Sequence, residues 1–86
     1  MYQIIERYIN KMSIDDVLNF ANKKNVDLSD DELNFTYKFI KKNWNQILSN
    51  PSSLNLERYK NVYSEENYNK INNLIKEYYQ KYRRFI

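Results

Sequence analysis

Glycine, cysteine and histidine are absent from this sequence, and proline occurs once, at Pro51. Tight hairpin turns use glycine for positive φ angles, so a sheet-rich fold would lack its usual turn residues, and glycine-rich phosphate loops are excluded. Without cysteine there is no disulfide, thiolate metal site or thiol nucleophile. Without histidine the commonest general base and metal ligand is missing. We therefore expect a protein that is not an enzyme, with no catalytic residue, no cofactor and no metal site.

Long apolar runs are also absent, since apolar residues stand at most in pairs such as Ile4-Ile5. A signal peptide or a transmembrane helix needs a much longer run, so the sequence predicts a cytoplasmic protein without a membrane partner. Asn, Lys, Ile and Tyr, all encoded by A/T-rich codons, together fill 42 of the 86 positions. This bias indicates a bacterial genome rich in A+T, and it can account for many of the tyrosines and lysines without any function.

The spacing of apolar residues predicts helices throughout residues 1–86, which we expect to form a single domain. The hydrophobic fraction of 42% and the charged fraction of 29% are those of an ordinary globular chain. We predict an all-α fold, a compact bundle of four to five helices with a long amphipathic C-terminal helix. The expected helices cover residues 1–11, 14–24, 29–48, a short segment after Pro51, and 64–84.

Serine residues mark three of the predicted helix starts. Ser13 and Ser64 each precede acidic residues that suit the first turn of a helix, and Ser29 with Glu32 has the spacing of a capping box. The third helix could continue to Leu48 or break near residues 43–45, where two asparagines flank a tryptophan. The last helix is predicted to be the longest.

Taken together, residues 9–21 (INKMSIDDVLNFA), 26–29 (VDLS) and 63–66 (YSEE) resemble the YqfT-like family of small helical proteins from low-GC Gram-positive bacteria. The similarity would extend over nearly the whole chain and consists of caps and apolar spacing. Where that pattern has a glycine at the end of the third helix, this chain has residues 41–43 (KKN). The resemblance implies a small helical cytosolic protein, and because the family carries no known activity it assigns no functional residue.

The acidic residues Asp30, Asp31 and Glu32 are the strongest carboxylate cluster. Paired carboxylates can perform acid–base chemistry or hold a divalent cation. All three follow Ser29 in the first turn of a helix, however, where capping and the helix dipole explain them. We therefore favour the structural interpretation. The serines lie at helix boundaries and have no histidine to activate them.

Surplus aromatic residues point to a protein-interaction or regulatory module, which is our leading functional hypothesis. This chain has more apolar residues than the core of a domain of its size requires. Several of them fall at or beyond the edges of the predicted helix stripes. A broader buried helix face would also explain them. The partner would be another protein, not identified by the sequence, or a second copy in a homodimer. The candidate contact residues are Phe20, Phe35, Tyr79 and Phe85.

The alternative is weak nucleic-acid binding through the basic, Tyr-rich C-terminal helix. The formal net charge of +3 falls entirely in residues 44–86, which carry seven basic and four acidic residues. Basic side chains neutralise phosphates and tyrosines stack on unpaired bases, although basic residues also suit a helix C-terminus. A helix-turn-helix is disfavoured, because residues 30–32 would place three negative charges at the start of the recognition helix. The candidate nucleic-acid contacts are Lys76, Lys81, Arg83 and Arg84.

Overall fold

The computed structural model describes residues 2–50 and 53–82, and three of its four α-helices begin at the predicted serines. Ser13 and Ser29 accept the backbone N–H three residues ahead, and in both cases that residue's carboxylate accepts the serine N–H in return. Ser64 accepts the backbone N–H of Asn67 in the same way. The helices are α1 (Tyr2–Lys11), α2 (Ile14–Lys23), α3 (Asp30–Ser49) and α4 (Glu65–Tyr82), with a short 3₁₀ helix, η2 (Leu56–Tyr59), before α4.

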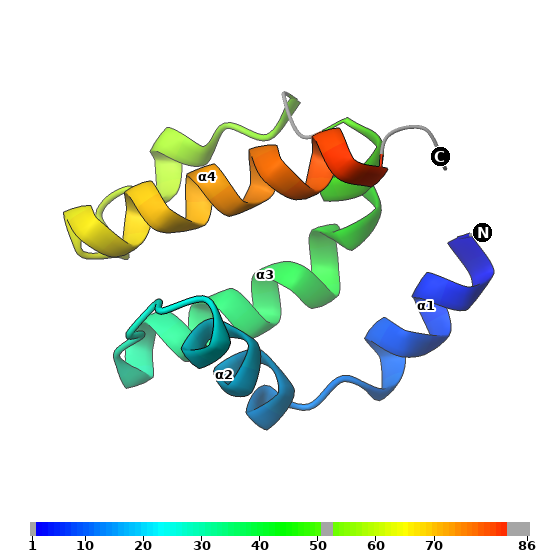
Figure 1. The fold of residues 1–86 in the computed structure, drawn as a ribbon, viewed down its shortest axis with the longest axis horizontal. Helices are drawn as coiled ribbons and strands as arrows, with labels where there is room; N and C mark the ends of the chain where they lie inside the picture. The colour runs from blue at the N-terminus through cyan, green and yellow to red at the C-terminus, as the bar shows by residue number, and fades with distance from the viewer. Residues whose placement is uncertain (1, 51–52, 83–86) are drawn as a thin grey trace.

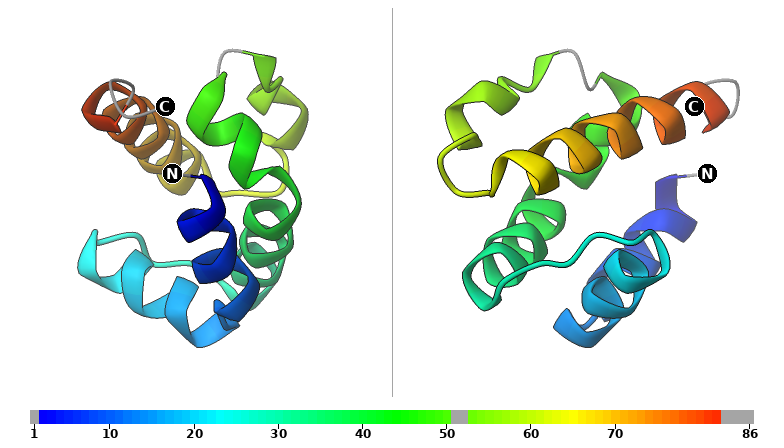
Figure 2. Two further views of the ribbon diagram at one scale, coloured as in Figure 1. Left: turned by 90° about the vertical axis from the view of Figure 1, so that its right-hand side faces the viewer. Right: turned by 60° about the vertical axis from the view of Figure 1, so that its left-hand side comes forward.

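The helix α3 forms the centre of the molecule. It crosses the view of Figure 1 diagonally, with α4 above it, α2 below it and α1 on the right. Each of these three helices packs against α3. Figure 2 shows that α4 and α2 project from α3 in different directions. The part of the chain that the structure describes contains no β-strand, so the all-α prediction is confirmed.

The structure settles three details of the predicted helices. First, α3 continues through Trp44 to Ser49 without a break, because residues on both sides of Trp44 keep helical hydrogen bonding. Second, α3 has 20 residues and α4 has 18 within the described chain, so the prediction that the last helix is the longest is not confirmed. Instead of an α-helix after Pro51, which lies outside the described residues, the structure has η2 at Leu56–Tyr59.

The closed part of the core is small. Ile9 of α1 and Met12, just after that helix, pack against Val17 of α2, and partly buried side chains of α3 lie against them. The most buried hydrophobic residue is Val26, at 2% exposure, in the connector between α2 and α3. The hydrophobic side chains of α3 and of residues 65–81 of α4 are only half-buried. This distribution leaves an apolar space open between the helices.

Among the described residues, no helix is both long enough and apolar enough to cross a membrane.

One apolar face of α1 is unusually exposed. Ile4 is 71% exposed and Tyr8 is 66% exposed, although both belong to the apolar stripe of the sequence. Residues four apart lie on one face of a helix, so α1 presents a second, uncovered apolar face to solvent.

Candidate functional site

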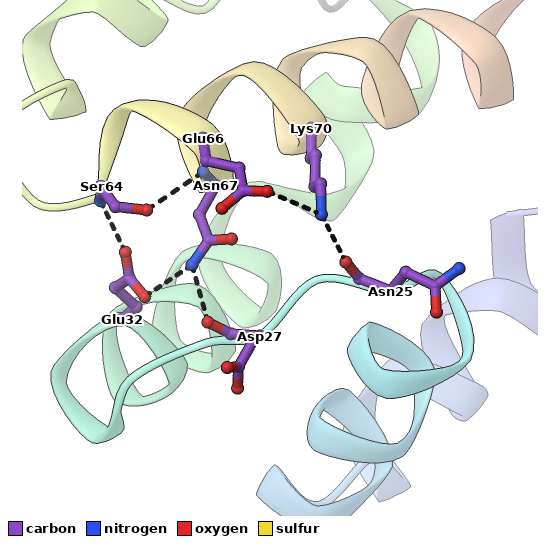
Figure 3. Close-up of polar contacts among 7 residues, drawn as sticks. All are labelled: Asn25, Asp27, Glu32, Ser64, Glu66, Asn67 and Lys70. Atoms are coloured by element: carbon purple, nitrogen blue, oxygen red, sulfur yellow. Dashed lines mark hydrogen bonds and ion pairs between the residues drawn. The ribbon is translucent and has the colours of Figure 1, made fainter.

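A buried carboxylate joins the start of α3 to the start of α4 (Figure 3). Glu32 is 5% exposed, and its Oε1 atom accepts the backbone N–H of Ser29 at 2.8 Å. Its Oε2 atom accepts the backbone N–H of Ser64 at 2.7 Å. Both donors belong to N-cap residues, whose N–H groups have no partner within a helix. Glu32 therefore supplies the acceptor for two helix starts at once.

Asn67 completes this cluster from the first turn of α4. It is also 5% exposed, and its Nδ2 atom donates to Glu32 Oε1 at 2.9 Å and to the backbone oxygen of Asp27 at 2.8 Å. The cluster thus ties α4 both to α3 and to the connector before it. A buried polar group that keeps all its hydrogen bonds does not destabilise the fold, and every buried side-chain nitrogen or oxygen in the described chain has a partner. We call Glu32, Ser64 and Asn67 the polar clasp.

The hydrogen bonds of the polar clasp favour the ionised form of Glu32. Burial is the largest single influence on its pKa and acts to raise it. The backbone N–H groups of Ser29 and Ser64, together with the Asn67 amide, act in the opposite direction. Together these hydrogen bonds outweigh the effect of burial and hold the pKa of Glu32 below its ordinary value of 4.5. Glu32 is thus an anion at neutral pH and serves as the acceptor for the N–H groups at two helix starts.

A hydrogen bond between Tyr63 and Thr36 extends the same contact along α3. The Tyr63 hydroxyl lies 2.6 Å from Thr36 Oγ1, which also donates to the backbone oxygen of Glu32 at 2.7 Å. Burial raises the pKa of Tyr63 above 10.0, the hydrogen bond with Thr36 opposes the rise, and the charge of Glu32 adds to it. Tyr63 therefore stays neutral at physiological pH and serves as a structural link between α3 and the segment before α4.

An apolar cleft of about 350 Å³ lies between α3, α2 and α4. Side chains from every helix and from the connectors line it, and none of the described lining residues carries a charge. Among the lining residues within 2–50 and 53–82, the side chains with polar atoms are those of Thr36, Asn72, Trp44 and four tyrosines. Its volume is at the lower end of the range found for small-molecule sites. Representative lining residues from five elements are Ile9, Ala21, Ile40, Leu56 and Ile75.

The cleft opens where the end of α2 faces α4. Phe20 is 45% exposed, whereas the other side chains that line the cleft are buried or half-buried. Its ring centroid lies 5.9 Å from that of Tyr78 on α4, and we call this exposed end of the cleft, with its two aromatic rings, the mouth. The Nζ atom of Lys24 lies 5.9 Å from the Phe20 centroid and 5.4 Å from the Tyr78 centroid. Lys81 Nζ is 5.9 Å from the same Tyr78 ring.

A cluster of aromatic rings forms another wall of the cleft. Phe35 lies 5.8 Å from Phe39, 5.2 Å from Tyr59 and 5.8 Å from Tyr63, measured between ring centroids. Phe39 in turn lies 5.1 Å from Tyr59 in an edge-on arrangement. Such offset and edge-to-face pairs are favourable geometries that hold η2 against α3. These rings are half-buried, and they take part in packing as well as in lining the cleft.

The predicted partner residues that the structure describes line two adjoining hollows. Phe20 and Phe35 both line the apolar cleft, with Phe20 at its mouth and Phe35 in its aromatic wall. Tyr79 lines a more polar hollow of about 490 Å³ between η2 and α4, which adjoins the cleft and shares Leu56 and Ile75 with it. Phe85 lies outside the described residues.

The predicted nucleic-acid contacts are also divided. Lys76 lines the polar hollow beside Tyr79, whereas Lys81 lies over Tyr78 at the mouth of the apolar cleft. Arg83 and Arg84 lie outside the described residues. Sequence reasoning missed Lys24 and Tyr78 as parts of the site. A signal was available for Lys24, because it follows Phe20 by four positions near the end of a predicted helix.

No family model, curated protein or solved structure matches this chain. The resemblance to the YqfT-like family therefore stays a prediction, and the functional argument depends on the geometry of the chain itself.

Proposed function

We propose that this chain is a non-enzymatic interaction module that binds apolar side chains of a partner protein in the cleft between α2, α3 and α4. The observation that carries the proposal is the mouth of the cleft, where Phe20 remains 45% exposed above an apolar space of about 350 Å³. Water in such a space finds few hydrogen-bond partners, so replacing it with apolar groups is favourable. Aromatic or aliphatic anchors in pockets of this kind supply most of the binding energy of many protein interfaces.

The volume of the cleft sets the size of what enters it. An apolar cavity of about 150 Å³ accommodates one benzene ring, so a space of about 350 Å³ takes roughly two ring-sized groups. A whole helix, about 10 Å across with its side chains, is too wide. The partner's backbone therefore stays outside, and two or three of its side chains enter.

The test is capture of partners from a lysate of the source organism, treated with nuclease, by three forms of the tagged protein. Phe20→Gln makes the mouth polar, and Ile4→Gln makes the same change at an exposed residue that does not line the cleft. We expect the wild type and Ile4→Gln to retain the same partner and Phe20→Gln to lose it. Circular dichroism must first show that both variants are folded.

Two outcomes would contradict this function. If all three forms capture the same proteins, the cleft is not the binding site. If nuclease removes everything that the wild type captures, the alternative hypothesis of nucleic-acid binding is preferred, and Lys76 and Lys81 become the first residues to substitute.

A further inference from the structure

The N-terminal end of α4 is tied to its neighbours by hydrogen bonds (Figure 3). Ser64 and Asn67 belong to the polar clasp and bind the Glu32 carboxylate. One turn further on, the Nζ atom of Lys70 donates to the backbone oxygen of Asn25 at 2.7 Å. All these donors lie within the first turns of α4 or just before it. The start of α4 therefore has a fixed position against α3 and against the connector between α2 and α3.

The next two turns of α4 border open space instead. Within the described chain, no side chain of residues 71–77 forms a hydrogen bond with another element. Ile71, Leu74 and Ile75 line the apolar cleft. Asn72 and Ile75 also line the polar hollow between η2 and α4. This part of α4 thus adjoins two hollows, and its hydrophobic side chains are only half-buried.

The side chain of Tyr78 brings α4 into contact with α2. Tyr78 lies 14 residues after Ser64, which is about 21 Å along the helix axis. Its ring centroid is 5.9 Å from that of Phe20, which keeps 45% of its surface exposed. A contact between two partly solvated rings fixes a distance less strictly than the hydrogen bonds of the polar clasp do. The two ends of α4 are therefore held unequally.

From this arrangement we propose that α4 pivots about the polar clasp and so controls entry to the apolar cleft. The structure is the open form, and in the closed form the second half of α4 lies nearer to α2. Closure is favourable because the walls of an empty apolar space lack the contacts that they make when they meet. The inference rests on the proposed function, since a partner that binds only the open form competes with closure.

The movement is measured on the full chain with pairs of spin labels. The sequence has no cysteine, so each double variant is labelled only at the two introduced sites. The mouth pair, Lys23→Cys/Lys81→Cys, uses two exposed residues that each follow one of the mouth rings by three positions. The clasp pair, Asp31→Cys/Glu65→Cys, uses exposed neighbours of the polar clasp. Electron paramagnetic resonance gives the distribution of distances within each pair.

We expect the mouth pair to show two groups of distances, with at least about 10% of the molecules in the minor group, and the clasp pair to show one. Benzene near saturation should shift the mouth pair towards the longer distances, because a molecule in the cleft favours the open form. Adding Phe20→Gln should cause the same shift, since a polar side chain opposes burial at the mouth. Adding Ile4→Gln on α1 is the control and should leave the distribution unchanged.

A cross-link then tests the consequence for binding. A short bismaleimide across the mouth pair holds α4 near α2, and the same reagent across the clasp pair is the matched control. In the nuclease-treated lysate, the protein linked at the mouth should lose the partner. The unlinked protein and the protein linked at the clasp should retain it.

Four results would overturn the pivot. The first is a single mouth distance that benzene does not change, and the second is a clasp pair as broad as the mouth pair. The third is fast hydrogen exchange throughout residues 71–81, which would mean that this part of α4 unfolds instead of moving as a helix. The fourth is a partner that binds equally well when the mouth is linked. Two groups of mouth distances without capture by any form would support the pivot and refute the proposed function.

Discussion

The Oε2 atom of Glu32 accepts the backbone N–H of Ser64 at 2.7 Å, across 32 positions of the sequence. Glu32 belongs to the first turn of α3, and Ser64 is the residue just before α4. Glu32, which completes the capping box of α3, is therefore also the hydrogen-bond acceptor for the residue that starts α4. This contact fixes the N-terminal end of α4 against the start of α3 (Figure 3).

Glu32→Gln should lower the free energy of unfolding by about 2 kcal/mol, because an amide NH2 group, which cannot accept a hydrogen bond, replaces one carboxylate oxygen. A buried backbone N–H of Ser29 or Ser64 then loses its acceptor. Urea unfolding measures the change. Asp31→Asn, at an exposed neighbour in the same turn, is the control and should cost no more than about 0.5 kcal/mol. Equal effects of the two substitutions would contradict the role assigned to the polar clasp.

The contribution of Glu32 to the free energy of unfolding should depend on pH. Its pKa is lowered in the folded protein, so between that pKa and the ordinary value of 4.5 the unfolded chain binds more protons. The stabilisation is thus fully present above pH 4.5 and is lost as the pH falls through the lower, folded pKa. The difference in unfolding free energy between the wild type and Glu32→Gln should shrink over that window. Urea titrations at a series of pH values measure it, and a difference that stays constant in acid would refute the shift.

Asn25 should tolerate glycine better than alanine. It has φ of 61°, in the left-handed region, and follows the C-cap of α2 in a Schellman motif, with the Val26 N–H bonded to the Ala21 oxygen at 2.8 Å. Lys70 uses only its backbone oxygen, which both substitutions keep. Asn25→Ala should cost about 1 kcal/mol, and Asn25→Gly should be neutral or stabilising. Thermal unfolding of both variants tests this, and an alanine variant as stable as the wild type would contradict it.

The apolar cleft should take up small apolar molecules. Benzene near saturation should raise the melting temperature by about 5 °C, since a ligand that binds only the folded state stabilises it. Pyrimidine, a ring of similar size with polar atoms, is the control and should have no effect. Calorimetry with each compound measures the shift. If benzene has no effect, the space is filled in solution and cannot receive a partner's side chains.

Local chemistry made much of this fold predictable. Ser13, Ser29 and Ser64 each start a helix, because capping depends on residues within one turn. The second use of Glu32 was not predictable in the same way, since nothing in residues 29–32 indicates that Ser64 will lie nearby. Capping and dipole effects accounted for Glu32 at the level of sequence, and its other partners became visible only with the packing of α4.

The candidate site was predicted only in part, for the same reason. Phe20 was identified as a surplus aromatic from its place beyond the stripe of its helix. Tyr78 belongs to the regular stripe of α4 and therefore looked like an ordinary core residue. The ring centroids of Phe20 and Tyr78 lie 5.9 Å apart because of the way α2 and α4 are placed in space. Helical periodicity in the sequence does not specify that placement.

Photocrosslinking inside cells of the source organism tests the central claim most directly. Benzoylphenylalanine in place of Phe20 puts the reactive group at the mouth of the cleft, and the same group in place of Ile4 puts it on the exposed face of α1. We predict a discrete adduct with another protein from position 20 and none of that mass from position 4. No adduct from position 20, or the same adduct from both positions, would contradict the claim that a partner docks in the cleft.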